Sequence, residues 1–289
     1  MSHVPPIIES CAALLARYDV LFCDVWGVVH DGRRAFPEAN EALSAFRAQG
    51  GTVILVSNAP TPSENVARVL DEKGVVRDAW DRIVSSGDLA LSHIRARGWQ
   101  RLHIIGPERR DRAFFAAVGA PSVPVADADA IACTGLVDDR NETAEHYRPL
   151  LAAAVARGLH LVCANPDLVV HVGDDLLPCA GAIGALYEEL GGEVFWAGKP
   201  FPVAYETAME SAAAIRGGAL APDHVLVIGD SMRTDLAGAA RAGVDALFIA
   251  SGIHRDEVMV EGRIDQRRLG RLFAPGSPGA VAVSTGLRP

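Results

Sequence analysis

Four short segments of the chain place carboxylate, hydroxyl, amide and ammonium groups after apolar runs. A carboxylate can attack phosphorus or bind Mg²⁺, and an ammonium group can neutralise developing negative charge. A hydroxyl and an amide can donate hydrogen bonds to phosphate oxygens. These groups therefore form a set that suits a phosphate ester and a divalent cation. The residues are Asp24, Ser57, Asn58, Lys199 and Asp230.

The two carboxylates could divide the work of phosphate hydrolysis. Asp24 is our candidate nucleophile, because a carboxylate that forms an aspartyl-phosphate splits hydrolysis into two easier steps. Two anions repel each other, so we expect Mg²⁺ as the cofactor, bound by Asp24, Asp230 and the substrate phosphate. Lys199 would neutralise the developing charge. Ser57 would donate its hydroxyl to a phosphate oxygen, and Asn58 its backbone or side-chain N–H.

Strand and helix patterns alternate along the chain. Several apolar runs have the length and the β-branched content of strands that are buried on both faces. The amphipathic stretches Glu38–Gln49 and Ser63–Lys73 each stop before a glycine, which predicts two helices. We expect Thr234 to cap a third helix that ends at Ala242. The predicted strands are Thr52–Val56, Leu102–Ile105, Leu159–Ala164, Val194–Ala197, Val225–Ile228 and Ala246–Ala250.

This alternation predicts an α/β fold with a doubly wound parallel sheet. In such sheets, ligands bind beyond the carboxyl ends of the strands, where the strand order reverses. Asp24, Ser57 and Asp230 each closely follow an apolar run, so the fold would bring them to one edge of the sheet. Their positions therefore support a site without reference to any family.

The motifs resemble those of the haloacid dehalogenase superfamily of phosphohydrolases, specifically its NagD-like branch, class IIA. The resemblance implies a Rossmann-like core in which Asp24 is the nucleophile and Asp230 binds the metal. It also implies that the backbone carbonyl of Trp26 is a metal ligand and that Asp235 orients the groups around the metal. The motifs are Asp24-Val25-Trp26-Gly27-Val28, Ser57-Asn58, Gly198-Lys199-Pro200 and Gly229-Asp230-Ser231-Met232-Arg233-Thr234-Asp235, of which the last is the most specific.

The interval between the second and third motifs is longer than a core sheet needs. Residues 98–192 contain strand-like and helical segments of their own, which predicts an inserted second domain, and the resemblance implies an α/β cap there. Residues 1–97 and 193–289 would then form the catalytic core. Polar groups cluster after an apolar strand of the inserted domain, and these are our candidates for substrate binding: Asn165, Asp167 and His171.

The chain departs from the family at Trp26, where related phosphatases have an Asp that protonates the leaving alcohol and then activates water. An indole has no titrating proton near neutral pH, and positioned acid–base catalysis is typically worth about 10²–10⁴-fold. The chain could use good leaving groups, or borrow a proton from His30 or Asp31. It could be a phospholigand-binding relative with impaired turnover. It could also run other chemistry, since metal-free dehalogenases carry an aromatic residue here, but Asp230 within Gly-Asp-Ser disfavours that alternative.

Composition narrows the class of protein. The net charge of −9 argues against a nucleic-acid partner. The N-terminus lacks the pattern of a signal peptide, and no apolar stretch reaches the ~20 residues of a membrane span. The five cysteines are odd in number and irregularly spaced, which favours a reduced, cytoplasmic compartment.

The sequence thus predicts a cytoplasmic, Mg²⁺-dependent phosphohydrolase that acts on a small phosphate monoester, such as a sugar phosphate or a nucleotide. The alternative is a phospholigand-binding relative without the general acid and base. The expected partner is a small phosphorylated metabolite. We expect the protein to bind neither nucleic acid nor a membrane, and a homodimer is one option for its assembly.

Overall fold

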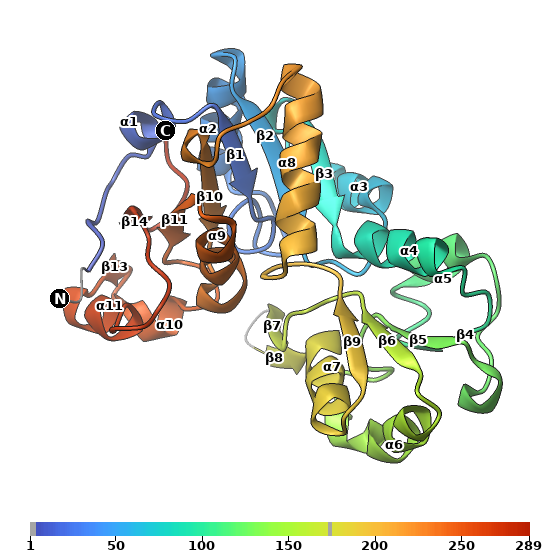
Figure 1. Ribbon diagram of the computed structural model, residues 1–289. Helices are drawn as coiled ribbons and strands as arrows, with labels where there is room; N and C mark the ends of the chain where they lie inside the picture. The colour runs from blue at the N-terminus through green and yellow to red at the C-terminus, as the bar shows by residue number, and fades with distance from the viewer. Residues whose placement is uncertain (1–3, 173–174) are drawn as a thin grey trace. The chain divides into compact units, whose positions relative to one another are not determined.

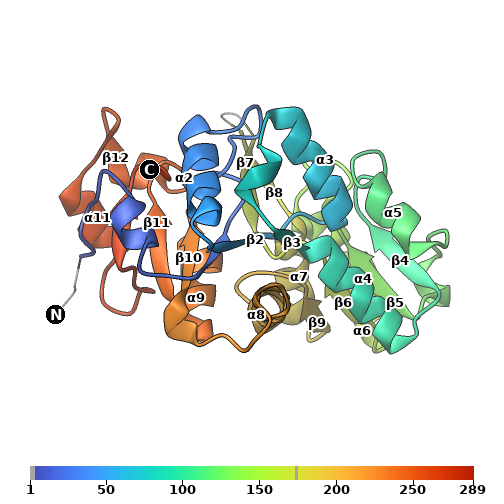
Figure 2. The ribbon, with the colours of Figure 1, turned by 90° about the horizontal axis from the view of Figure 1, so that it is seen from above.

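The computed structural model describes residues 4–172 and 175–289, which divide into two compact units (Figures 1 and 2). The first unit contains the described residues up to Ser57, together with Ala67–Val84 and Tyr205–Pro289. The second contains Asn58–Val66 and the described part of Ser85–Ala204. Each unit has a sheet of its own.

The first unit is built on a six-stranded sheet with the order β14-β11-β10-β1-β2-β3. The pairings from β14 through to β2 are parallel, and every residue of β1, β2 and β10 is buried. The continuous apolar runs therefore form strands covered on both faces, as the sequence predicts. The strands are β1 (Val20–Cys23), β2 (Thr52–Ser57), β3 (Arg82–Ser85), β10 (Val225–Gly229), β11 (Asp245–Ile249) and β14 (Ala282–Ser284), with a separate pair β12 (Met259–Val260) and β13 (Arg263–Ile264).

Helices connect these strands and begin and end at residues with identifiable local signals. Pro37 begins α2, and Gly243 in the left-handed conformation follows α9. The helices α3 and α8 contain residues of both units. The helical segments are α1 (Ala12–Leu15), α2 (Pro37–Ala48), α3 (Ser63–Lys73), η1 (Arg77–Ala79), α8 (Pro202–Arg216), η4 (Pro222–His224), η5 (Met232–Leu236), α9 (Ala237–Ala242), α10 (Arg255–Val258) and α11 (Gln266–Leu272).

The second unit contains a four-stranded parallel sheet with the order β4-β5-β6-β9 and an antiparallel pair, β7 with β8. The helices α6 and α7 pack on the sheet around Ile131, Leu161 and Tyr187, which are fully buried (Figure 1). The elements are α4 (Ser86–Arg97), β4 (Leu102–Ile105), α5 (Arg112–Val118), η2 (Val125–Asp127), β5 (Ala130–Cys133), η3 (Ala144–Tyr147), α6 (Arg148–Ala156), β6 (His160–Cys163), β7 (Val169–Val172), β8 (Asp175–Pro178), α7 (Ala180–Glu189) and β9 (Glu193–Trp196).

The structure confirms the predicted α/β class with its parallel sheet, and two details differ from the expectations. Thr234 does not cap the helix, because the Ser231 hydroxyl accepts the hydrogen bond from the Thr234 N–H and the helical segment begins at Met232. The strand Glu193–Trp196 pairs with β6 in the second unit, although the sequence analysis assigned residues from 193 onward to the core. The division into a core and an inserted domain at residues 98 and 192 stays a prediction.

Two further observations concern the described residues. None of their helices combines the length and apolar character needed to cross a membrane. All five cysteines are buried, and none of them forms a disulfide among the described residues.

Candidate functional site

The register of the first unit's sheet brings the polar residues after β1, β2 and β10 to one edge. Cys23 is level with Ile228 on β10 and with Leu55 on β2. Asp24 follows Cys23 directly, and its N–H still donates to the Ile228 carbonyl at 2.8 Å. Because neighbouring strands lie about 4.8 Å apart, Asp24 has the chain segments of Ser57 and Asp230 on either side.

Three buried carboxylates meet at this edge. Asp24, Asp230 and Asp235 each offer one oxygen, and these oxygens lie within 4.8 Å of one another. The three residues are 9%, 6% and 1% exposed. Like charges so close in a poorly hydrated site repel strongly, and a divalent cation among them would offset that repulsion. Because Mg²⁺ prefers oxygen ligands, this set of donors fits it.

Glycine backbones enclose the Asp230 carboxylate. A Cβ atom at Gly252 would lie 1.9 Å from Asp230 Oδ2, and one at Gly27 would lie 2.1 Å from the same oxygen. Gly27 also has a φ of +85°, which only glycine adopts readily. The same oxygen accepts a hydrogen bond from the Ile253 N–H at 2.8 Å. The carboxylate is therefore oriented by backbone atoms from two other loops.

Asp235 joins the cluster because of the helical segment that follows Asp230. Ser231 caps this segment, and its carbonyl accepts hydrogen bonds from the N–H groups of both Asp235 and Leu236. The Asp235 carboxylate accepts a hydrogen bond from the Ser231 N–H at 3.2 Å. The sequence analysis expected Asp235 to orient the groups around the metal, and the structure places one of its oxygens beside those of the two expected ligands.

Asn58 and Lys199 belong to the second unit, whereas Ser57 belongs to the first. Both backbone groups of Lys199 bond to the Asn58 side chain: the Lys199 N–H donates to Asn58 Oδ1 at 2.8 Å, and Asn58 Nδ2 donates to the Lys199 carbonyl at 3.1 Å. Lys199 is 3% exposed and Asn58 is 6% exposed. The amide of Asn58 thus fixes the loop that carries the buried lysine.

The predicted substrate residues of the inserted domain also lie in the second unit. Asn58 Nδ2 donates a second hydrogen bond, to Asp167 Oδ1 at 2.9 Å, and Asn165 Oδ1 accepts from the Asp167 N–H at 3.0 Å. His171 is half-buried on β7, where it is level with Leu176 of β8. Asn58, Asp167 and Lys199 are therefore brought together within this unit.

Trp26 occupies a loop that is held by His30 and Gly32. Its indole is 39% exposed and packs edge-on against the His30 ring at 5.2 Å between centroids. A Cβ at Gly32 would lie 2.6 Å from the indole, and the Lys73 ammonium donates to the Gly32 carbonyl. The indole is thus confined by its own loop.

Neither residue considered as a replacement acid carries a readily released proton at neutral pH. Burial, and to a smaller extent the nearby charge of Lys73, lowers the pKa of His30 to about 4. Its Nδ1 accepts a hydrogen bond from the Gly32 N–H at 2.9 Å. Hydrogen bonds from the backbone around Arg34 lower the pKa of Asp31. Both groups are therefore poor proton donors near pH 7.

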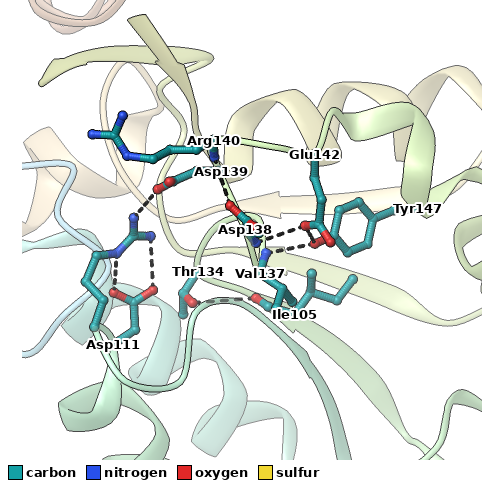
Figure 3. A network of polar contacts seen from close by, with 10 residues as sticks. Ile105, Asp111, Thr134, Val137, Asp138, Asp139, Arg140, Glu142 and Tyr147 are labelled. Atoms are coloured by element: carbon teal, nitrogen blue, oxygen red, sulfur yellow. Dashed lines mark hydrogen bonds and ion pairs between the residues drawn. The ribbon is translucent and has the colours of Figure 1, made fainter. Parts of the chain in front are cut away.

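A polar network that the sequence analysis missed lies beyond the carboxyl ends of β4 and β5 in the second unit (Figure 3). Arg110 donates to both carboxylate oxygens of Asp111 and, at 2.6 Å, to Asp139. Arg140 in turn donates to Asp175 at 2.7 Å. The Arg110–Asp139 and Arg140–Asp175 pairs join separate segments of the chain, and the sequence carries no signal for them because these partners meet only in the folded chain.

Comparisons with known proteins agree with this architecture. A model of haloacid dehalogenase-like hydrolases matches residues 21–120, and a second, HAD-hydrolase-like model matches residues 196–268. The ribonucleotide monophosphatase NagD of Escherichia coli (strain K12) is 24% identical over 81% of this chain and 88% of its own.

Two solved structures are similar over most of their length. A hydrolase of the haloacid dehalogenase-like family from Brucella suis 1330 has a TM-score of 0.84 and 40% identity, covering 97% of this chain and all of that one. A glycerol phosphate phosphatase from Mycobacterium tuberculosis in complex with calcium has a TM-score of 0.62 and 28% identity, covering 90% of this chain and 78% of that one. The chain therefore belongs to the haloacid dehalogenase-like hydrolase family, within its NagD-like branch.

Proposed function

We propose that the protein is a Mg²⁺-dependent phosphohydrolase that cleaves a small phosphate monoester through an aspartyl-phosphate intermediate. The observation that carries this proposal is the buried cluster of Asp24, Asp230 and Asp235 beyond the carboxyl ends of the parallel strands. Relatives named as a ribonucleotide monophosphatase and as a calcium-bound glycerol phosphate phosphatase support the substrate class and the divalent cation. Sugar phosphates and nucleotides are the two candidate classes of substrate.

Asp24 is the proposed nucleophile. One of its oxygens forms a bond to phosphorus while the bond between phosphorus and the leaving oxygen breaks, and the leaving group takes the electron pair. Water then attacks the same phosphorus, which releases inorganic phosphate and regenerates the carboxylate. Asp24, Asp230 and the Trp26 carbonyl would hold Mg²⁺, which supplies positive charge for the phosphoryl oxygens.

Ser57, Asn58 and Lys199 are the proposed groups for phosphate binding. The Ser57 hydroxyl can donate to one phosphate oxygen, and Lys199 can neutralise charge that develops in the transition state. The two hydrogen bonds between Asn58 and the Lys199 backbone support a role for Asn58 in presenting the lysine. Asn58 also donates a hydrogen bond to Asp167, which is one of the proposed substrate-binding residues.

Trp26 should limit which leaving groups the enzyme can release rapidly. Trp26 offers no carboxyl group, His30 is an uncharged imidazole and Asp31 is ionised near neutral pH, so none of these three residues readily protonates the leaving oxygen. Such a reaction favours leaving groups that are stable as anions. Aryl phosphates and acyl phosphates should therefore be better substrates than alkyl phosphates.

We further propose that residues 98–192 form a cap that closes over the site, excludes water and contacts the leaving group. Asn165, Asp167 and His171 are its proposed substrate-facing residues. His171→Ala should then change the relative kcat/KM values of sugar phosphates and nucleotides. The kcat/KM of acetyl phosphate should stay the same, because its leaving group, acetate, is too small to make many contacts with the cap. We also propose a cytoplasmic location, which cysteines without disulfides favour.

The second candidate is a phospholigand-binding protein with impaired turnover, and Trp26 is the observation that favours it. A screen for phosphate release decides between the two, with p-nitrophenyl phosphate, acetyl phosphate and a panel of sugar phosphates and nucleotides, each with Mg²⁺ and with a chelator. Turnover that needs Mg²⁺ and is lost in Asp24→Asn supports the enzyme. Tight binding of a phosphorylated ligand without any turnover supports the second candidate.

A further inference from the structure

The loop after β11 contains a histidine that touches the turn after Asp230. The Nε2 atom of His254 accepts a hydrogen bond from the Met232 N–H at 3.3 Å, and its Nδ1 lies 2.7 Å from a carboxylate oxygen of Glu257. The His254 side chain is largely buried, with 16% of its surface exposed. The ring therefore connects the loops that follow the neighbouring strands β10 and β11.

These two contacts determine the tautomer of the ring. Because Nε2 accepts a hydrogen bond, the ring proton must be on Nδ1, from which it is donated to Glu257. Both ring nitrogens are thereby engaged, and neither has a proton to spare for a leaving group. The geometry suits a ring that holds two loops in place rather than one that transfers a proton.

The loop held by this ring is the one that orients Asp230. Ile253 immediately precedes His254, and its N–H donates to Asp230 Oδ2 at 2.8 Å. Gly252 approaches the same oxygen so closely that a Cβ atom there would lie 1.9 Å from it. A shift of the loop would therefore move the hydrogen bond and the backbone surface that fix the carboxylate.

We propose that His254, oriented by Glu257, is a positioning residue for the metal-binding carboxylate of Asp230. The proposal rests on the proposed function, because it takes Asp230 as a ligand of Mg²⁺. Partners in the outer shell of a metal site typically contribute about 10–100-fold to metal affinity. His254 acts through the adjacent Ile253 N–H, so its loss should have an effect near the lower end of that range.

The test measures Mg²⁺ affinity by calorimetry, with folding followed by circular dichroism. His254→Ala should bind Mg²⁺ about 10-fold more weakly while it stays folded. His254→Gln, whose amide oxygen can accept from the Met232 N–H, should recover most of that affinity. The matched control is His224→Ala: His224 also lies 2.7 Å from a carboxylate, that of Asp19, but it precedes β10, and its loss should not change Mg²⁺ binding.

Unchanged affinity in His254→Ala would overturn the inference, as would a Gln variant that is no better than the Ala variant. If His254→Ala does not fold, Glu257→Ala tests the same arrangement, and normal Mg²⁺ affinity in that variant would also overturn it. Asp230→Ala separates this inference from the proposed function. If Asp230→Ala binds Mg²⁺ normally, the proposed metal site itself is wrong. If Asp230→Ala loses Mg²⁺ while His254→Ala and Glu257→Ala both bind it normally, only the role of His254 is wrong.

Discussion

The two parallel sheets both collect acidic residues beyond the carboxyl ends of their strands, but with different neighbours. At the edge of the six-stranded sheet, carboxylates of Asp24, Asp230 and Asp235 face one another within 4.8 Å. At the edge of the four-stranded sheet, Asp111 and Asp139 face the guanidinium group of Arg110 (Figure 3).

This difference in neighbours distinguishes a candidate metal site from a structural clip, by which we mean the ion pairs of Arg110 with Asp111 and Asp139. A guanidinium that bonds to two carboxylates neutralises them and joins the loops that carry them. Carboxylates that face one another repel, and such an arrangement is typical of places where a cation binds. The two edges thus share a position in the fold, and the mutually facing carboxylates are the reason for proposing the metal site at the first edge.

The largest expected effect comes from replacing the nucleophile at the first edge. Asp24→Asn keeps the shape of the side chain but removes the attacking charge, so phosphatase activity should fall by about 10⁴-fold or more. The comparable change at the second edge, Asp111→Asn, should leave turnover within about threefold of normal, because it removes no reacting group. Near-full turnover of p-nitrophenyl phosphate by folded Asp24→Asn would refute the covalent mechanism.

A gain of activity is expected from Trp26→Asp. The new carboxyl group can protonate the leaving alcohol, so hydrolysis of alkyl and sugar phosphates should rise by up to about 10²–10⁴-fold. The rate with p-nitrophenyl phosphate should change much less, because its leaving group needs no proton. Measured kcat values for both substrate classes test this, and fast turnover of an alkyl phosphate by the unchanged protein would mean that another acid is present.

A loss of stability is expected from breaking the clip at the second edge. Arg110→Ala removes two hydrogen bonds from Asp111, whose side chain is 5% exposed, and should lower the free energy of unfolding by about 1–3 kcal/mol. Arg148→Ala is the matched control, because its pairs with Glu145 and Glu189 are exposed and should contribute less than about 1 kcal/mol. Urea unfolding measures both, and equal effects would contradict the distinction.

An effect that is confined to acidic pH is expected at His30. Its pKa is lowered from 6.5 to about 4, so between these pH values the unfolded chain binds a proton that the folded protein does not. The free energy of unfolding should therefore fall by up to about 3 kcal/mol as the pH decreases through this window. His30→Asn keeps an acceptor for the Gly32 N–H and removes the titration, so its stability should depend less on pH. Identical pH profiles of the two proteins in urea unfolding would exclude His30 as the cause.

Local signals explain which parts of the fold could be predicted from the sequence. The helix Ser63–Lys73 was predicted with its observed bounds, because periodic apolar residues and a following glycine mark it. The cap of the helix after Asp230 was assigned to Thr234 instead of Ser231. Both residues carry a hydroxyl at a suitable distance from the helix, and only the folded backbone selects between them.

Tertiary contacts explain what the sequence could not reveal about the candidate site. The sequence predicts Asp24 and Asp230 as site residues because each is a carboxylate that follows an apolar run. The loop after β11 also follows an apolar run and therefore lies at the same edge of the sheet. Gly252, Ile253 and His254 were missed because nothing in that loop suggests metal binding until the register places β11 beside β10. The Arg110 clip was missed for a related reason, since its partner Asp139 belongs to another loop.

Mg²⁺ binding measured by calorimetry on the unchanged protein, Asp230→Ala and Asp111→Ala tests the central claim most directly. The account predicts one Mg²⁺ site in the unchanged protein, its loss in Asp230→Ala, and its retention in Asp111→Ala, because among the described residues the first edge alone gathers three carboxylates around a common point. Normal Mg²⁺ binding by folded Asp230→Ala would contradict the account.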